Sequence, residues 1–310
     1  MQTRRIGPLE VTTVGLGCNN FGWRLDYDRS VAVIDAALDA GINFFDTADI
    51  YGGTESEEFI GRALQGRRDQ VILATKFGMK VDDQRQGAKP DYVLRACEDS
   101  LRRLRTDHID LYQLHQPDPS TPIGDTLAAL DRLVRAGKVR QIGCSNFSAQ
   151  QLREARQAAG EGARFVSVQN EYSLLHREPE KEVLAECERE GLAFLPYFPL
   201  ASGMLTGKYR MGKPLPENAR LSNGRPRFVN DRNLGIVEEL IDFAAFRGHS
   251  LLELAFSWLL TRPAVASVIA GATSPEQVRS NVRAAGWHLT HADLAEVDKL
   301  APLDTPIPAP

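Results

Sequence analysis

The sequence has little cysteine, and its cysteines form no close pair. The four are Cys18, Cys97, Cys144 and Cys187, with no CxxC spacing among them. A structural zinc site or a disulfide framework needs closely spaced or regularly paired cysteines, so this distribution argues against both. We therefore expect reduced thiols buried in a protein core.

Long apolar runs and an excess of one charge are also lacking. No stretch predicts a membrane-spanning helix, and the two arginines near the N-terminus are not followed by the apolar segment of a signal peptide. The 37 Lys and Arg residues nearly balance the 41 acidic residues, for a net charge of -4. This balance argues against a nucleic-acid partner or a polybasic membrane contact. We expect a cytoplasmic protein with neither nucleic-acid nor membrane partners.

What the sequence does contain is a regular alternation of strand-like and helix-like segments. The predicted strands lie at 14–18, 44–46, 71–75, 109–114, 141–144, 165–168, 192–198 and 265–269. Helix-start signals follow them, such as the capping box of Thr54 and Glu57 after the second strand. Repeated strand–helix units require parallel strands with right-handed crossovers. Eight of them predict an α/β fold closed into a (β/α)8, or TIM, barrel, as a single domain over residues 1–310.

A doubly wound open sheet is the alternative architecture. Gly15 and Gly17, directly after a strand, superficially resemble the glycine-rich fingerprint of dinucleotide-binding folds. Asn20 stands where the third glycine of that fingerprint belongs. An open sheet also needs only five or six strands, so the eight units favour the barrel.

The segment 201–232, after the seventh predicted strand, is too long for an ordinary barrel connection. It is also rich in basic residues: Lys208, Arg210, Lys213, Arg220, Arg225, Arg227 and Arg232. Two interpretations fit this charge equally well. The segment is either a solvated surface loop or a lid-like loop that covers an anionic cofactor.

Ionisable side chains stand at the ends of three consecutive predicted strands. Asp46 ends the second strand, Tyr51 lies in the loop after it, Lys76 ends the third and His115 ends the fourth. The carboxyl ends of barrel strands form one edge, so these four groups can converge there. A buried lysine needs a partner, and Asp46 is the natural one. One such pair is often structural, but joint occurrence at three strand ends favours a catalytic site.

The combination predicts proton transfer to and from a carbonyl compound. The charge of Lys76 should lower the pKa of Tyr51 from about 10, so that the phenol exchanges a proton near neutral pH. His115 is placed to hydrogen-bond the same carbonyl oxygen. A Schiff-base aldolase using Lys76 is disfavoured, because the Asp46 carboxylate keeps the amine protonated. No metal site is predicted, since only Asp49 joins Asp46 as a close carboxylate and no histidine cluster accompanies them.

With these motifs the chain resembles an aldo-keto reductase over nearly its whole length. The family's catalytic Asp, Tyr, Lys and His correspond to Asp46 and Tyr51 in F-D-T-A-x-x-Y-G, Lys76 in A-T-K and His115 in L-x-x-H. The resemblance implies Tyr51 as general acid and base and a nicotinamide cofactor as hydride donor. It also implies an N-terminal β-hairpin, within 3–14, that closes the bottom of the barrel.

Within the family, the chain looks most like the aryl-alcohol dehydrogenase-like and potassium-channel β-subunit-like branch. This branch includes barrels that partner other proteins. The alternative function is therefore a cofactor-binding regulatory or interaction subunit with weak turnover. The main expectation is an enzyme acting on a small carbonyl or alcohol substrate, as a monomer or a small homo-oligomer.

The resemblance implies a cofactor site along the remaining strand ends. Ser145, Asn146 and Gln169 match the residues that contact the nicotinamide amide, and Tyr197 matches the aromatic residue that stacks on the ring. Further implied contacts are Phe198, Pro199, Leu200, Lys208, Arg210, Gly271, Thr273, Gln277 and Asn281. From the residues alone, Ser and Asn at strand ends also fit simple turn formers.

The cofactor preference depends on two of these positions. Many family members carry Lys and Arg where this chain has Gly271 and Gln277, and those cations grip the 2′-phosphate of NADP. An uncharged amide holds a dianion more weakly than a guanidinium does. Because Lys208 and Arg210 offer substitute contacts, we expect NADP(H) to be preferred over NAD(H) by a small margin.

Aromatic residues near the catalytic edge bear on the substrate. Trp23 follows the first strand, and Phe77 follows Lys76 directly. As substrate-binding walls they would suit aryl or alkyl aldehydes, or the apolar face of a sugar. Alternatively, Phe21 and Trp23 only plug the top of the barrel.

Overall fold

The computed structural model describes residues 1–217, 221 and 228–303, and its centre is a sheet of eight parallel strands. Their order is β10-β3-β4-β5-β6-β7-β8-β9. The strands are β3 Val14–Gly17, β4 Phe44–Asp46, β5 Ile72–Phe77, β6 Ile109–Leu114, β7 Val139–Ser145, β8 Phe165–Glu171, β9 Ala193–Tyr197 and β10 Val268–Gly271. Phe194 closes the ring, since its N–H donates to the Ala264 carbonyl (2.7 Å) and its carbonyl accepts from the Ala266 N–H (3.0 Å). The predicted barrel is confirmed.

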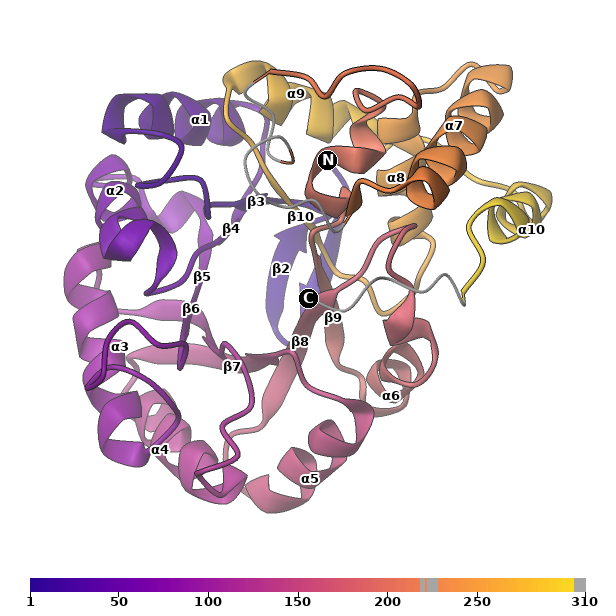
Figure 1. The fold of residues 1–310 in the computed structure, drawn as a ribbon. Coiled ribbons are helices and arrows are strands. Elements are labelled where there is room, and N and C mark those ends of the chain that lie inside the picture. The colour runs from indigo at the N-terminus through magenta and orange to yellow at the C-terminus, as the bar shows by residue number, and fades with distance from the viewer. Residues whose placement is uncertain (218–220, 222–227, 304–310) are drawn as a thin grey trace.

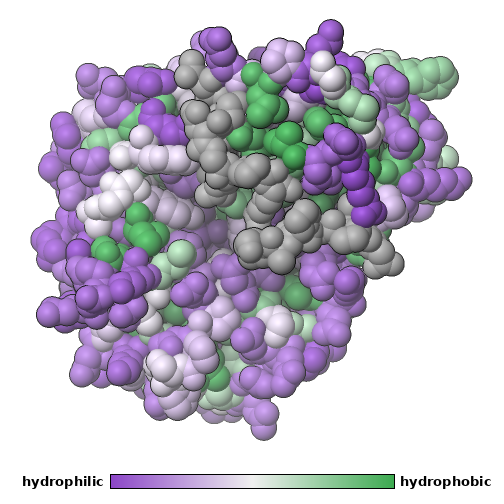
Figure 2. Space-filling view, in the orientation of Figure 1, coloured by the Kyte–Doolittle hydropathy of each residue, from purple (hydrophilic) through white to green (hydrophobic). Residues whose placement is uncertain are grey.

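Helices surround the strands as an outer ring (Figure 1). They are α1 Tyr27–Asp39, α2 Glu55–Ala63, α3 Pro90–Leu104, α4 Ile123–Arg135, α5 Ala149–Ala159, α6 Val183–Glu190, α7 Asp231–Phe246, α8 Leu251–Leu260, α9 Pro275–Ala284 and α10 His291–Leu300. Short 3-10 helices are η1 Tyr51–Thr54, η2 Arg68–Gln70, η3 Glu178–Glu180 and η4 Ala201–Thr206. On the face shown in Figure 2, hydrophilic residues predominate along the outer rim. Across the part of the chain that the structure describes, every helix is too short or too polar to cross a bilayer.

An antiparallel hairpin of β1 (Thr3–Ile6) and β2 (Leu9–Thr12) lies across one end of the barrel. Its apolar side chains pack against the side chains that fill the barrel interior. This inner cluster contains Ile6, Leu9, Val11, Phe44, Ala74, Leu111, Leu195 and Ile269. The hairpin expected from the resemblance is present, and among the described residues it covers the end of the barrel opposite the carboxyl-terminal edge of the strands.

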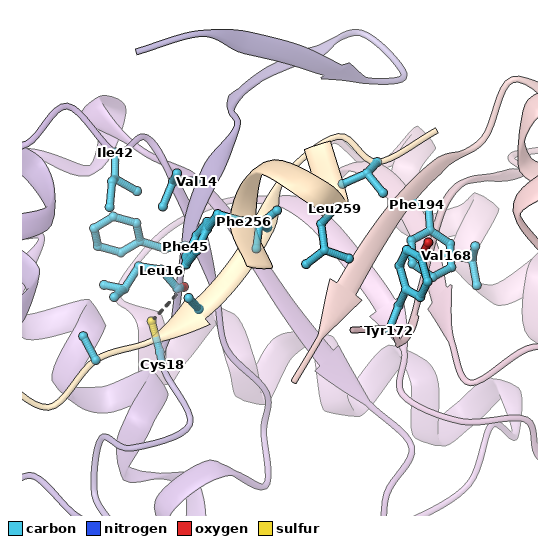
Figure 3. Close-up of a cluster of buried hydrophobic side chains, with 14 of the residues drawn as sticks. Val14, Leu16, Cys18, Ile42, Phe45, Val168, Tyr172, Phe194, Phe256 and Leu259 are labelled. Atoms are coloured by element: carbon cyan, nitrogen blue, oxygen red, sulfur yellow. Dashed lines mark hydrogen bonds between the residues drawn. The ribbon is translucent and has the colours of Figure 1, made fainter. Parts of the chain in front are cut away.

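A second apolar layer lies between the strands and the helices (Figure 3). In it, Leu16 and Phe45 of neighbouring strands pack with residues of α8 such as Phe256. Helical spacing explains the contribution of each helix, since one stripe of its residues faces the barrel. All four cysteines are buried and unpaired, as predicted. The two layers hold the strand ends in one rigid frame.

Local structure departs from the sequence pattern at the start of α2. The predicted capping box at the start of α2 is wrong. Thr54 has a φ of 91°, and its side chain caps no backbone N–H of the helix. The Glu57 side chain bonds instead to residues of β5 and α3. The segment 201–232 begins with the short helix η4 and ends in α7. Of its basic residues, Arg220, Arg225 and Arg227 lie outside the described residues.

Candidate active site

Four ionisable side chains meet at the open end of the barrel. Lys76 is fully buried, and its Nζ donates to Asp46 Oδ2 at 2.6 Å and to the Thr47 carbonyl at 2.8 Å. The same Nζ lies 3.5 Å from the Tyr51 hydroxyl. The rings of Tyr51 and His115 meet edge to face, with centroids 5.8 Å apart. The strand register explains this convergence, since β4, β5 and β6 are direct neighbours.

The ionisation of these groups follows from burial and from their partners. Burial disfavours the charged form of Lys76, but Asp46 and Tyr51 outweigh it and raise the lysine pKa. Burial raises the pKa of Tyr51 above its usual value, against the opposing charge of Lys76. The prediction of a lowered tyrosine pKa is therefore wrong, because desolvation of the phenolate exceeds the effect of one ammonium group already paired with a carboxylate.

His115 is uncharged at neutral pH. Burial, followed by the charge of Lys76, lowers its pKa to about 3. Its Nδ1 is buried without a hydrogen-bond partner among the described residues. A neutral imidazole next to the phenol can orient an oxygen atom without competing with Tyr51 as the proton donor.

Two amide side chains hold the carboxylate of Asp46. Gln169 Nε2 donates to Asp46 Oδ1 at 2.9 Å, and Gln113 Nε2 donates to the same atom at 3.2 Å. Gln113 was missed by the sequence reasoning. A signal was available. Gln113 lies on β6, two residues before His115, so the two side chains point to the same, inner face of the barrel.

A cavity of about 790 Å³ opens above these residues. Asp46, Tyr51 and His115 line one end of it. Its walls include most of the residues predicted to hold a cofactor: Ser145, Asn146, Gln169, Tyr197, Phe198, Pro199, Leu200, Lys208, Gly271, Thr273, Gln277 and Asn281. Residues at the ends of β7 to β10 and in the loops after them therefore line one continuous space with Asp46, Tyr51 and His115.

Near the catalytic end, hydrogen bonds fix the polar residues. Tyr197 donates its hydroxyl to Asn146 Oδ1 at 2.8 Å. Asn146 Nδ2 donates to the His115 carbonyl at 2.9 Å and to Ser145 Oγ at 3.2 Å. Asn146 adopts a φ of 62°, a left-handed conformation that asparagine tolerates better than most residues. These bonds orient the cavity wall beside His115.

The far end of the cavity lies at the start of α9. Gln277 Oε1 accepts from the Thr273 N–H at 2.8 Å and from its hydroxyl at 3.1 Å, so the loop is closed on itself by neutral groups. A side chain at Gly271 would meet Asn20 Nδ2 at 3.2 Å, so the asparagine occupies the space of a longer residue there. At this end of the cavity the loop offers an anion the N-terminus of α9 rather than a cationic side chain.

Three predicted site residues do not reach the cavity. Arg210 forms an ion pair with Glu238 at 2.5 Å on the surface. Phe77 is fully buried and stacks on Tyr112 with centroids 4.7 Å apart, so it belongs to the apolar core. Trp23 is 58% exposed and is not among the described residues that line the cavity. Lys76 and Arg24, the sequence neighbours of Phe77 and Trp23, point toward the site, but the strand pleat and the turn direct Phe77 and Trp23 elsewhere.

Other lining residues went unnoticed in the sequence. Arg24 lies in the cavity wall near Lys208, and partial burial together with the Arg24 charge lowers the pKa of Lys208. Met79 and Gln116 also line the cavity, and Gln116 follows His115 directly in the sequence. No sequence signal distinguishes them, since each stands in an irregular loop. Over the described residues, no three His, Cys, Asp or Glu side chains gather as a potential metal site.

Comparison with known proteins agrees with this geometry. Residues 13–302 match the sequence profile of the aldo/keto reductase family. The chain is 36% identical over 304 residues to aldo-keto reductase YhdN from Bacillus subtilis (strain 168), covering 94% of this chain and 90% of that one. It is 34% identical over 305 residues to probable aldo-keto reductase 1 from Glycine max, covering 95% and 86%. The solved structure of glycerol dehydrogenase AKR11B4 from Gluconobacter oxydans superposes with a TM-score of 0.85 at 34% identity, covering 99% and 98%.

Proposed function

The chain belongs to the aldo/keto reductase family, an oxidoreductase family, and from this we propose that it is an NAD(P)H-dependent enzyme that interconverts an aldehyde or ketone, sugars included, with its alcohol. Tyr51 is the general acid and base, assisted by Lys76, Asp46 and His115. One observation carries the proposal: Lys76 Nζ lies between Asp46 Oδ2 and the Tyr51 hydroxyl at the floor of the cavity. Metal ions play no part in this scheme.

The proton moves between Tyr51 and the carbonyl oxygen of the substrate. Because burial raises its pKa, Tyr51 holds its proton at neutral pH and is in the correct state to donate it. As the phenolate forms, the Lys76 ammonium stabilises its charge, and Asp46 keeps that ammonium in place. His115, being neutral, hydrogen-bonds the same oxygen and orients the carbonyl. In the reverse direction the Tyr51 phenolate recovers the proton from the alcohol.

The cavity fits a dinucleotide cofactor. Its 790 Å³ run from Tyr51 to Asn281, with polar side chains along the strand ends and Lys208 on the side. A Cβ at Gly203 would lie 3.3 Å from Lys208 Cε, so glycine leaves room for the lysine at this wall. Ser145, Asn146 and Gln169 would hold the nicotinamide amide, Tyr197 would stack on the ring, and the N-terminus of α9 would take a phosphate. The cofactor supplies the hydride.

We propose that NADP(H) is preferred over NAD(H) by a small margin. Lys208 supports this preference, whereas Arg210 contributes little because Glu238 holds it. The neutral loop at Gly271 and Gln277 limits the margin. Titration with NADPH and with NADH, followed by quenching of protein fluorescence, tests the cofactor class and the preference together.

We place the chain in the aryl-alcohol dehydrogenase-like and potassium-channel β-subunit-like branch, on the strength of Lys208 after the seventh barrel strand. For substrates, Met79 and Gln116 give the catalytic end one apolar and one polar wall. The similarity to a glycerol dehydrogenase adds short polyols and their carbonyl forms to the aryl and alkyl aldehydes worth testing.

The test is the variant Tyr51→Phe. With a panel of aldehydes and hydroxyketones, it should lose nearly all turnover, because the proton donor is gone, while NADPH quenching stays unchanged. Near-normal turnover in this variant would mean that another group donates the proton. A wild-type protein that binds cofactor but reduces no member of the panel would instead support the regulatory-subunit alternative.

A further inference from the structure

A second group of buried ionisable side chains lies behind the catalytic pair, on the outer side of β5. Successive side chains on a strand point to opposite faces, so Thr75 points outward where Lys76 points into the barrel. Thr75 donates its hydroxyl to Glu57 Oε1 of α2 at 2.5 Å, and Arg103 Nε of α3 donates to Glu57 Oε2 at 2.7 Å. Glu57 is fully buried. None of these outer residues has a part in the proposed proton transfer.

Asp49 adds a second carboxyl group to this cluster without adding a cation. It is 3% exposed, and its Oδ1 is buried with no hydrogen-bond partner among the described residues. The nearby cations are already engaged: Arg103 with Glu57, and Lys76 with Asp46. An unpaired carboxylate in such a place is costly, whereas a protonated carboxyl group is tolerated.

The backbone connects Asp49 directly to the catalytic groups. Its N–H donates to the Lys76 carbonyl at 3.0 Å. Tyr51 follows two residues later, and the Tyr51 N–H donates to the Ala48 carbonyl at 3.2 Å. The segment from Asp46 to Tyr51 is therefore a short, tightly bonded turn, and a shift of Asp49 must also shift Tyr51.

We propose that Asp49 is a positioning residue that keeps Tyr51 beside Lys76 only while its own carboxyl group is protonated. When it ionises, two carboxylates face one guanidinium in a closed space, and Asp49 moves toward solvent. Because the turn is short, this movement draws the Tyr51 hydroxyl away from Lys76 Nζ. The inference rests on the function proposed above and adds a residue that lies outside the cavity.

The surroundings of Asp49 agree with this role. The titratable and charged groups that face it are Glu57 from α2, Arg103 and Tyr92 from α3, Lys76 from β5 and Tyr112 from β6. Burial, followed by the Glu57 charge, raises the pKa of Asp49 to about 7, against Arg103, a hydrogen bond from the Ile50 backbone and Lys76. The change of state therefore falls in the physiological range.

The kinetic test compares pH profiles of kcat for carbonyl reduction between pH 5.5 and 9. For the wild type, kcat should fall at least about tenfold as Asp49 ionises, with little change in the KM for the cofactor, because the reacting geometry is lost. Asp49→Asn should remove the inflection, since the amide stays neutral. Glu57→Gln should move the inflection to lower pH. Asp69→Asn, at an exposed aspartate, should keep the wild-type profile.

A second measurement does not need turnover. In protein labelled with 13C at the Asp carboxyl carbons and the Tyr ζ carbons, Asp49→Asn and Tyr51→Phe assign the two signals. The Tyr51 signal should shift with the same midpoint as that of Asp49, and the shift should vanish in Asp49→Asn. An unshifted Tyr51 signal, a shift that persists in Asp49→Asn, or an Asp49 carboxyl that does not titrate between pH 5.5 and 8.5 overturns the proposal. Failure of the wild type to reduce carbonyls while the two signals still titrate together would count against the proposed function alone.

Discussion

Asp49→Asn should change the pH dependence of stability by a predictable amount. The pKa of Asp49 rises to about 7 in the folded protein from the usual 3.8. A carboxyl group with a raised pKa contributes stability that is fully present below pH 3.8 and is lost as the pH rises to 7, because the unfolded chain ionises first. The full loss is about 4 kcal/mol, of which about 3 kcal/mol falls between pH 5 and pH 8.

The assay is urea unfolding at pH 5, 6, 7 and 8, with the free energy of unfolding extrapolated to water. All other titrating groups are shared, so they largely cancel in the difference between the variant and the wild type. Asp49→Asn should gain on the wild type by about 3 kcal/mol across this range, with most of the gain below pH 7. Asp69→Asn, at an exposed aspartate, is the control for the loss of one negative charge. A difference between Asp49→Asn and the wild type that stays constant with pH would refute the assigned ionisation.

Further variants separate the roles of neighbouring residues. Lys76→Met should lower kcat by about a hundredfold or more, measured in steady state, because the phenolate loses its stabilising charge; unchanged kcat would exclude that role. Phe77→Ala should lower the free energy of unfolding by about 3–5 kcal/mol, as a cavity in the core does. If the variant changed only the KM for the substrate, Phe77 would instead contact the substrate, as the sequence predicted. Lys208→Ala should weaken NADPH binding in the fluorescence titration, whereas Arg210→Ala, its partner being Glu238, should leave it nearly unchanged. Equal losses for both would place Arg210 at the cofactor.

The barrel and the convergence of ionisable groups at its open edge could be predicted from the sequence because both depend on local patterns. Each strand is an apolar run that ends in a polar residue, and in a parallel barrel every such end lies at the same rim. Asp46, Tyr51, Lys76 and His115 were found in this way. Gln113 could have been found by the same period of two, since it precedes His115 by two residues.

Other features depend on packing that no local pattern records. Phe77 follows Lys76 in sequence, but the pleat turns it outward onto Tyr112. Glu57 resembles a helix-capping residue, yet Thr75 and Arg103, distant in sequence, take both of its oxygens. Arg210 carries the expected charge, but Glu238 lies close enough to bind it.

The sequence by itself determined the fold class and the meeting of the four candidate proton-transfer groups, because strand periodicity and strand order place those residues at one rim. Only the tertiary structure decided the ionisation of these groups and the contacts that the neighbouring residues make. Burial raises the pKa of Tyr51 although a cation lies 3.5 Å away, and it raises the pKa of Asp49 against the charges of Arg103 and Lys76. Desolvation depends on everything that surrounds a group in space, and that information is spread over the whole chain.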